Sequence, residues 1–332
     1  MPDSALPPVQ FVGTGSYLPE QMLTNGDLEK MVETSDEWIT ARTGIKERRL
    51  AAENQATSDL ATQAALAALD DAGLTAEDLD LILLATISAD MFFPSTACLV
   101  QKNLGATRAF AFDLSAACSG FLYGVDLAKR YLETGGAQTV MVIGAEKLSS
   151  QVNWEDRNTC VLFGDGAGAA ILQRGDESTG RVLSTVMGSD GRQADILKVP
   201  AGGSALPITP QVAEQKLNTI YMAGREVYKL AVTAMRDAAL EAIQAAGLTA
   251  EDIAMVIPHQ ANLRIIEAIN DRLGIPKERC FVNLEKYGNT SAAAIAIALD
   301  EAAKSGAIQR GDKVCLVVFG AGLTWAASVV EW

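Results

Sequence analysis

Short apolar runs alternate along the chain with longer stretches whose apolar residues follow helical spacing. Apolar runs bounded by Gly, Asn and Asp are typical of buried strands, whereas longer Ala-rich stretches are typical of helices. In the first half, the pattern predicts strands at residues 9–12, 81–86, 139–143 and 167–172. In the second half, it predicts strands at residues 182–187, 255–259, 313–319 and 325–330.

One segment, Ala-Gly-Leu-Thr-Ala-Glu-Asp, occurs at residues 72–78 and again at residues 246–252. In both copies an Ala-rich helical pattern precedes it, its Gly falls where a helix would end, and an apolar strand follows. Residues 112–114 and 282–284 then open the next unit of each half, and a helix of small residues follows each. Because the surrounding pattern matches as well as the letters, we interpret the chain as a duplication rather than a chance repeat.

Each half therefore follows a β-α-β-α-β-α-β-β pattern, which predicts an α/β protein. Strands that alternate with helices favour a mixed, largely parallel sheet in each half. The halves should meet near residues 173–180, which are polar and contain Gly. We expect one unit at residues 1–176 and a second at residues 177–332.

The composition and charge narrow the function classes. Nearly half of the residues are hydrophobic, which favours an extensive core, and abundant Ala and Gly favour close packing of helices on the sheet. The net charge is −14, and no Lys/Arg-rich run offsets it. Such a surface repels nucleic acid and anionic membranes, so we expect neither as a partner.

The five cysteines form no C-x-x-C pair, and the chain has a single His. We therefore expect no metal site, no bound cofactor and reduced thiols in the cytoplasm. The N-terminus lacks the basic and apolar regions of a signal peptide. The uncharged stretch at residues 314–330 approaches the length of a membrane span, but a Gly-Ala-Gly break predicts two buried strands instead.

Three polar residues fall where α/β sheets bind ligands, at strand ends and helix starts. His259 ends a predicted strand, Cys118 begins a predicted helix, and Asn289 lies in the duplicated counterpart of the Cys118 turn. Duplication with pseudo-twofold symmetry would bring the two helix starts together beside His259. A Cys at a helix start gains thiolate character from the helix dipole, so we expect a lowered pKa for Cys118.

Each residue also has a structural interpretation. A lone His is more often a packed residue than a catalytic one, and Cys118 could simply be small enough for a tight helix contact. The other cysteines lie in strand-like or helical patterns and are better interpreted as core residues: Cys98, Cys160, Cys280 and Cys315.

The motifs around these residues occur in one order along almost the whole chain. They are Thr34-Ser35-Asp36-Glu37-Trp38, Ala117-Cys118-Ser119-Gly120-Phe121, Gly164-Asp165-Gly166-Ala167-Gly168, Pro258-His259-Gln260-Ala261-Asn262, Tyr287-Gly288-Asn289-Thr290-Ser291 and the Phe319–Trp325 run. They resemble β-ketoacyl-acyl-carrier-protein synthase III, the condensing enzyme that starts bacterial fatty-acid synthesis. The resemblance implies the thiolase fold, with the two halves forming an α-β-α-β-α layered architecture.

The single His separates branches of that superfamily. Thiolases and elongating synthases need a second His, which leaves the Cys–His–Asn enzymes: initiating synthases and plant-type polyketide synthases. The His-Gln-Ala-Asn context and the chain length favour the former.

The resemblance implies a decarboxylative condensation of an acyl-CoA starter, most simply acetyl-CoA, with malonyl-acyl-carrier-protein. Cys118 would carry the acyl group, and His259 and Asn289 would stabilise the enolate. Backbone N–H groups of Cys118 and Ala321 would form the oxyanion hole, although the family commonly has Gly at the position of Ala321.

The resemblance also implies binding residues. CoA would contact Thr34, Trp38, Arg42, Arg157, Gly224, Ala261 and Asn262. Phe93 would cap the acyl pocket of a partner subunit in a homodimer. The acyl carrier protein would dock on Lys229, Arg264 and Arg272, although solvated surface charge explains these three equally well.

Other functions stay open. A same-fold enzyme of secondary metabolism, or one that uses long acyl chains, would carry the same three residues. A non-catalytic partner subunit or an acyl-CoA-binding module would not need them.

Overall fold

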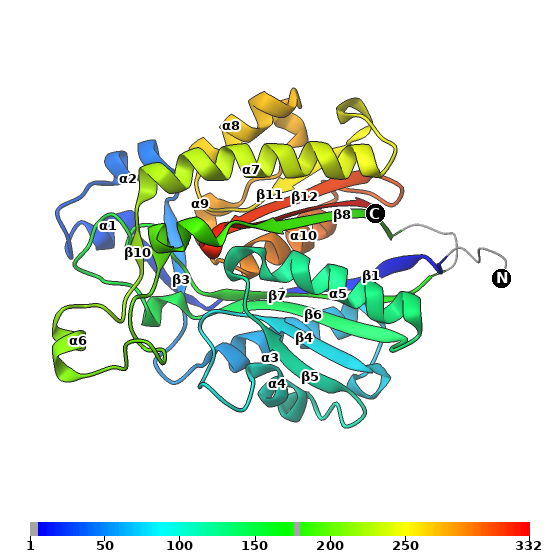
Figure 1. Ribbon diagram of the computed structural model, residues 1–332, viewed down its shortest axis with the longest axis horizontal. Helices are drawn as coiled ribbons and strands as arrows, with labels where there is room; N and C mark the ends of the chain where they lie inside the picture. The colour runs from blue at the N-terminus through cyan, green and yellow to red at the C-terminus, as the bar shows by residue number, and fades with distance from the viewer. Residues whose placement is uncertain (1–5, 176–179) are drawn as a thin grey trace.

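The computed structural model describes residues 6–175 and 180–332. Its helices and strands form five layers (Figure 1). Helices α3 and α4 cover one sheet half, α7 and α8 cover the other, and α5 and α10 lie between the two halves. This is the α-β-α-β-α architecture that the family resemblance implies. The expected boundary between residues 176 and 177 lies outside the described residues.

The strands of the first half are β1 (Val9–Tyr17), β2 (Gln21–Thr24), β3 (Glu47–Leu50), β4 (Leu81–Ala85), β5 (Phe110–Leu114), β6 (Thr139–Glu146) and β7 (Gly166–Arg174). Those of the second half are β8 (Arg181–Ser189), β9 (Leu197–Lys198), β10 (Tyr221–Met222), β11 (Met255–Pro258), β12 (Lys313–Gly320) and β13 (Thr324–Glu331). All eight strands predicted by residue range are present, and residues 112–114 of the first half lie in β5.

The helices of the first half are α1 (Asn25–Leu28), α2 (Asp36–Thr43), α3 (Thr57–Ala72), α4 (Thr96–Leu104) and α5 (Gly120–Thr134). Those of the second half are α6 (Pro210–Glu214), α7 (Gly224–Ala245), α8 (Leu263–Leu273), α9 (Leu284–Tyr287) and α10 (Ala293–Lys304).

The main sheet of the described residues has the order β11-β12-β13-β8-β1-β7-β6-β4-β5. It is mixed, as expected: β6, β4 and β5 pair in parallel, as do β11 and β12, while β7 and β13 run antiparallel to their neighbours. Among the described residues, the sheet passes from one half to the other where Gln10 of β1 pairs with Arg181 of β8.

The second half departs from the predicted duplication at one place. The run at residues 282–284 does not form a strand, although Cys280, just before it, forms an isolated bridge with Val256. The backbone N–H groups of Asn283 and Leu284 instead donate to the side-chain oxygen of Gln260, at 2.9 and 3.2 Å. A side chain thus takes the donors that a strand ladder would need.

The structure also tests two expectations about single segments. The uncharged stretch at residues 314–330 forms β12 and β13 with a turn between them, as predicted. Cys160 lies in a turn rather than in a strand-like run. None of the described helices has the length and apolar character that a bilayer crossing would need.

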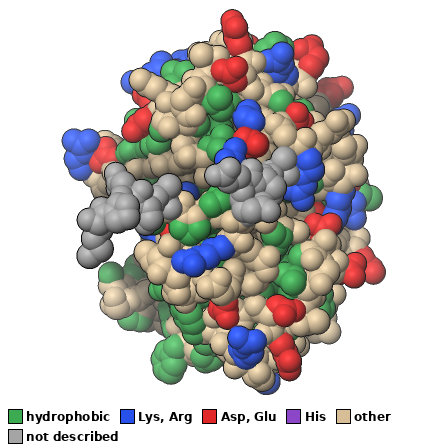
Figure 2. Space-filling model, turned by 90° about the vertical axis from the view of Figure 1, so that its right-hand side faces the viewer, with side chains coloured by type: hydrophobic (Ala, Val, Ile, Leu, Met, Phe, Trp, Pro, Cys, Tyr) green, Lys and Arg blue, Asp and Glu red, His purple; other side chains and the backbone are tan. Residues whose placement is uncertain are grey.

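The surface mixes charges of both signs. On the face at the right of Figure 1, acidic and basic side chains are interspersed, and no continuous basic patch appears (Figure 2). This agrees with the absence of Lys/Arg-rich runs in the sequence.

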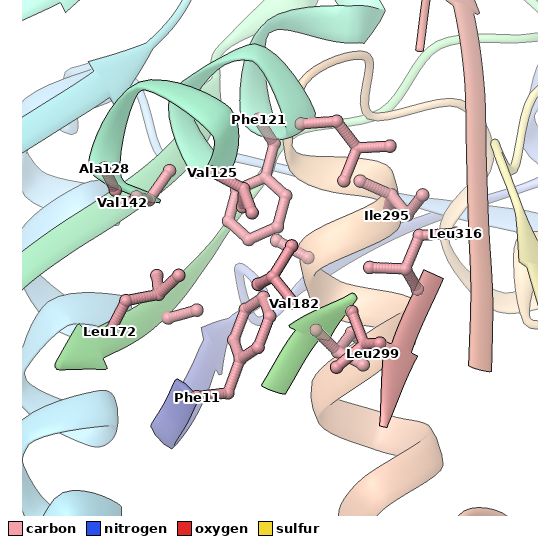
Figure 3. Close-up of a cluster of buried hydrophobic side chains, with 14 of the residues drawn as sticks. Phe11, Phe121, Val125, Ala128, Val142, Leu172, Val182, Ile295, Leu299 and Leu316 are labelled. Atoms are coloured by element: carbon pink, nitrogen blue, oxygen red, sulfur yellow. The ribbon is translucent and has the colours of Figure 1, made fainter. Parts of the chain in front are cut away.

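The central core joins the halves. Phe121 and Val125 of α5 and Ile295 and Leu299 of α10 point into one apolar cluster with Phe11 of β1 (Figure 3). Both helices that pack here begin directly after the turns that carry Cys118 and Asn289, so the core fixes where these turns lie.

Candidate active site

A cavity of about 1590 Å³ contains the three polar residues that the sequence singles out. Cys118, His259 and Asn289 all line it. They come from three segments that are far apart in the sequence, and the structure brings them together as the duplication argument expects. The catalytic roles of these residues stay predictions.

Cys118 lies in a single 3₁₀ turn, Ala117–Ser119, that leads into α5. Ala117 has φ +46°, in the region that L-residues rarely adopt. Gly320 packs against this turn so closely that a Cβ there would lie 2.7 Å from the Cys118 backbone nitrogen. The end of β12 can therefore approach the Cys118 backbone only because residue 320 is Gly.

The expectation of a lowered Cys118 pKa is wrong for this cavity. The pKa of the thiol is raised to about 12, mainly by burial and also by the negative charge of Glu146, while a hydrogen bond with Ser291 acts in the opposite direction. Only 7% of Cys118 is exposed. The loss of hydration therefore outweighs the favourable end of the helix, and no cation among the described residues compensates for it.

His259 follows β11, and its backbone N–H donates to the Val317 carbonyl oxygen at 2.8 Å. This bond continues the pairing of β11 with β12 and fixes where the imidazole projects. Burial lowers the pKa of His259 to about 4, so the ring is neutral at pH 7. Its Nδ1 is buried without a hydrogen-bond partner among the described residues.

Asn289 is held through both its backbone and its side chain. Its backbone N–H donates to the Leu162 carbonyl oxygen at 2.8 Å, and its own carbonyl oxygen accepts from Gly164 at 3.1 Å. Its side-chain oxygen accepts from the Ser291 backbone N–H at 2.9 Å. The amide nitrogen is therefore the end that can donate to a ligand in the cavity.

Ala321 opens the short turn Ala321–Leu323 and lines the cavity. The positive φ values of this turn fall on Gly322 and Leu323, at +73° and +46°, and not on Ala321. The Cβ of Ala321 therefore causes no backbone strain, and a backbone donor is available here without Gly.

Two buried residues of this site were missed from the sequence. Ser291 accepts a hydrogen bond from the Cys118 thiol at 3.5 Å, and Glu146 lies close enough to affect the pKa of Cys118. Ser291 stands in a motif already singled out. Glu146 is the last residue of β6, so the strand-end argument that identified His259 would also have identified Glu146 if the predicted strand had not stopped at Ile143.

Five of the seven residues expected to bind CoA line the cavity. The guanidinium carbons of Arg42 and Arg157 lie 4.7 and 5.1 Å from the ring centroid of the half-buried Trp38. Arg157 donates to the Glu33 carbonyl oxygen at 2.8 Å instead of forming an ion pair. The cavity is lined by Trp38, Arg42, Gly224, Ala261 and Asn262, but not by Thr34 or Arg157.

The expected docking residues lie partly in the cavity and partly outside it. Arg264 lines the cavity and donates to the Ala41 carbonyl oxygen at 3.1 Å. Arg272 lies at the other end of α8 and Lys229 lies on the neighbouring α7, and both are exposed outside the cavity. Phe93 is 85% exposed between β4 and α4.

Comparison with known proteins agrees with the fold. A family model described as 3-oxoacyl-[acyl-carrier-protein] synthase III matches residues 112–191, and the model of its C-terminal part matches residues 243–332. β-Ketoacyl-[acyl-carrier-protein] synthase III of Caldanaerobacter subterraneus subsp. tengcongensis is 59% identical over 97% of both chains. Its counterpart in Clostridioides difficile is 56% identical over 97% of this chain and 98% of the other.

Solved structures also resemble this chain over almost its whole length. The crystal structure of 3-oxoacyl-[acyl-carrier-protein] synthase III from Aquifex aeolicus VF5 is 50% identical, with a TM-score of 0.90 over 98% of this chain and 100% of that one. A priming β-ketosynthase from the R1128 polyketide pathway is 35% identical, with a TM-score of 0.89 over 99% and 98%. The chain has the predicted thiolase-type fold and belongs to the β-ketoacyl-acyl-carrier-protein synthase III family.

Proposed function

We propose that the protein condenses an acyl-CoA starter with malonyl-acyl-carrier-protein and releases CO₂, CoA and a 3-ketoacyl-acyl-carrier-protein, which starts fatty-acid synthesis. The observation that carries this proposal is the meeting of Cys118, His259 and Asn289 in one cavity of a chain of this family. The cavity is large enough for an extended thioester substrate, and typical ligand cavities measure about 300–1,000 Å³.

In the first half-reaction, the Cys118 sulfur attacks the starter thioester, the bond to the CoA sulfur breaks, and the thiol proton leaves with CoA. Backbone N–H groups of Cys118 and Ala321 would stabilise the oxyanion. Because the pKa of the Cys118 thiol is raised to about 12, proton removal has to accompany the attack.

In the second half-reaction, the malonyl thioester oxygen accepts hydrogen bonds from His259 and Asn289. The bond to the carboxylate breaks, CO₂ leaves, and the electron pair forms an enolate. The enolate carbon attacks the acyl group on Cys118, and the thiolate leaves and regains a proton. A neutral imidazole suits this role because it donates a hydrogen bond without protonating the carbanion.

CoA recognition would use the mouth of the cavity. An adenine ring could stack on Trp38 in place of one of its two guanidinium neighbours, and Asn262 and Ala261 would flank the pantetheine arm. Thr34 carries a buried hydroxyl oxygen without a partner among the described residues, which is consistent with a place near a polar ligand.

Intact-mass measurement after mixing with a panel of acyl-CoAs tests this function. We expect acetyl-CoA to acylate the protein and the Cys118→Ala variant to stay unmodified. Loading by long or aromatic acyl groups alone would favour a role in secondary metabolism. The 35% identity to a polyketide priming enzyme supports that role, but less strongly than the higher identities above support fatty-acid synthesis. Binding without any covalent adduct would contradict the proposal.

The carrier protein would dock on Arg264, which lines the cavity, and on Lys229 and Arg272, which are exposed on α7 and α8 outside it. We expect Arg264→Glu to raise the KM for malonyl-acyl-carrier-protein while acylation by acyl-CoA persists. Asp271→Asn, on the same helix, serves as a control for altered charge. Equal loss of both half-reactions in Arg264→Glu would argue against docking at this residue.

The active unit would be a homodimer in which Phe93 reaches the acyl pocket of the partner. Support comes from the exposure of three consecutive large apolar side chains, Met91, Phe92 and Phe93, at 48%, 89% and 85%. Exposed apolar clusters of this kind are common at protein interfaces.

A further inference from the structure

Glu146 is a buried carboxylate near Cys118 that does not line the cavity and that the mechanism above does not use. It ends β6 and is 0% exposed. Its hydrogen bonds come from neutral hydroxyl and N–H groups, and no Lys or Arg in the described part of the chain pairs with it. A buried, unpaired carboxylate is costly, so its position beside a nucleophile needs an explanation.

The two carboxylate oxygens of Glu146 accept different numbers of hydrogen bonds. Oε2 accepts from the Thr86 hydroxyl at 3.0 Å, the Ser88 hydroxyl at 2.6 Å and the Ile87 N–H at 3.1 Å. Oε1 has only a longer contact from the same Ile87 N–H, at 3.3 Å. Oε1 can therefore accept another hydrogen, and the Ser291 hydroxyl lies close enough to lower the pKa of Glu146 by a hydrogen bond.

Ser291 connects Glu146 to Cys118. Its hydroxyl oxygen accepts from the Cys118 thiol at 3.5 Å, so its own hydrogen is free to be donated to the carboxylate. Ser291 is 2% exposed and has φ +49°, which L-residues adopt at a cost. The strained backbone holds the hydroxyl between thiol and carboxylate.

We infer that Glu146, acting through the Ser291 hydroxyl, is a positioning residue that controls the ionisation of Cys118. When Glu146 is ionised, Ser291 donates to it and accepts from Cys118, which keeps the thiol protonated. When Glu146 is protonated, the chain can reverse: the carboxyl donates to Ser291 and Ser291 donates to the thiolate. The inference rests on the proposed role of Cys118 as the nucleophile.

Electrostatics supports both directions of this coupling. Burial raises the pKa of Glu146 to about 7, so both of its states are populated near neutral pH. The Glu146 charge raises the pKa of Cys118, and the Ser291 hydrogen bond lowers it. The groups that face Glu146 from the neighbouring described elements are Thr86 and Ser88 after β4, Ser291 before α10 and Cys118 before α5, and of these only the thiol titrates.

The test is the pH dependence of Cys118 alkylation by iodoacetamide, a neutral probe, followed by mass spectrometry of the peptide that carries Cys118. In the unmodified protein, the logarithm of the rate should rise with pH, flatten near the pKa of Glu146 at about 7, and rise again as the thiol itself ionises. The flat region arises because Glu146 and Cys118 retain one proton between them above this pH. The fraction of molecules in which Glu146 holds that proton, and Cys118 is a thiolate, then no longer depends on pH.

Two variants should move the profile in opposite directions. Glu146→Gln removes the like charge and can still donate to Ser291, so the flat region should disappear and alkylation should shift to lower pH by about one unit or more. Ser291→Ala removes the hydroxyl that can donate to the Cys118 thiolate when Glu146 is protonated, so alkylation should shift to higher pH. In the double variant, the effect of Glu146→Gln should shrink because the connecting hydroxyl is gone.

Asp165→Asn is the matched control. Asp165 is also buried and its pKa is also raised by burial, but its oxygens accept from Ser149 and Ala51 and not from the cavity. This variant should keep the profile of the unmodified protein. Thermal unfolding of each variant establishes that it is folded.

Superimposable profiles for folded Glu146→Gln and the unmodified protein would overturn the inference, as would shifts of Glu146→Gln and Ser291→Ala in the same direction. If Glu146→Gln does not fold, a single uninterrupted rise in the unmodified protein overturns the inference on its own. Alkylation needs no acyl-CoA or carrier protein, so this failure is distinct from a failed acylation panel, which would remove the proposed function instead.

Discussion

At the scale of single residues, burial decides the chemistry of the cavity. It keeps the Cys118 thiol protonated and the His259 ring neutral, with pKa values of about 12 and about 4. Because His259 is the one His of the chain, a second imidazole cannot share its work. The cavity therefore offers neutral donors to a developing enolate rather than a charged acid.

His259→Ala should separate the two half-reactions. The variant loses a donor to the enolate, and loss of one such donor typically costs about 3 kcal/mol, a rate decrease of 10²- to 10³-fold. We expect decarboxylation of malonyl-acyl-carrier-protein to fall by about this factor while acylation of Cys118 by acyl-CoA remains detectable by intact mass. Normal condensation by the variant would refute the proposed role.

The pKa of His259 leads to a prediction about pH. Its folded value of about 4 lies below the ordinary value of 6.5, so the ring gains its proton only as the pH falls toward 4. Decarboxylation by a Cys118→Ala variant, which removes the Glu146 connection, should therefore stay constant between pH 8 and about 5.5. Loss of rate around pH 6.5 would show that the imidazole titrates normally.

At the scale of secondary structure, periodicity predicted where strands occur better than where they end. β1 was expected to stop at Val12 but continues to Tyr17 through two glycines. A Cβ at Gly15 would lie 2.3 Å from the Ala68 backbone nitrogen, so this part of the strand is Gly because α3 packs directly on it. Such close contacts depend on the partner element and leave no periodic signal in the strand itself.

The same limit applies to the candidate site. Strand ends and duplication were enough to bring Cys118, His259 and Asn289 together. The connection from Cys118 through Ser291 to Glu146 and the direction of the thiol pKa depend on burial and on which side chains meet. These follow from tertiary packing, which sequence spacing does not report.

Gly144→Ala tests how strongly packing positions this site. A Cβ at residue 144 of β6 would lie 2.2 Å from the Ala292 carbonyl oxygen, immediately after Ser291. The start of α10 would have to move, so we expect a loss of about 1–3 kcal/mol in the free energy of unfolding and slower acylation of Cys118. Urea denaturation measures the first effect and intact mass the second.

Gly191→Ala is the control for that change, because nothing lies within 4 Å of the added Cβ. It should leave stability unchanged or slightly raised and acylation unaffected. Equal stability and activity of the Gly144 and Gly191 variants would mean that the contact between β6 and α10 is not tight.

At the scale of the whole molecule, the net charge of −14 and the apolar cluster at residues 91–93 act on association in opposite ways. Like charge opposes self-association over long distances, so a stable dimer requires a local apolar interface. In Figure 1 the edge strand β5 lies on the opposite side of the molecule from α7. The chain pairs β5 with β4 on one side, which leaves its other edge open within the described sheet.

We therefore expect the protein to sediment as a dimer and the double variant Phe92→Asp/Phe93→Asp to sediment as a monomer with little condensation activity.

Phe93→Ala should stay dimeric and accept longer starters, because a smaller side chain would cap the partner's acyl pocket. Leu240→Asp changes a 43% exposed residue of α7, away from this cluster, and should leave both properties unaltered. Sedimentation velocity gives the mass and intact-mass loading gives the starter range. A fully active monomer would show that each chain completes its own acyl pocket, and unchanged starter use by Phe93→Ala would assign the cap to another residue.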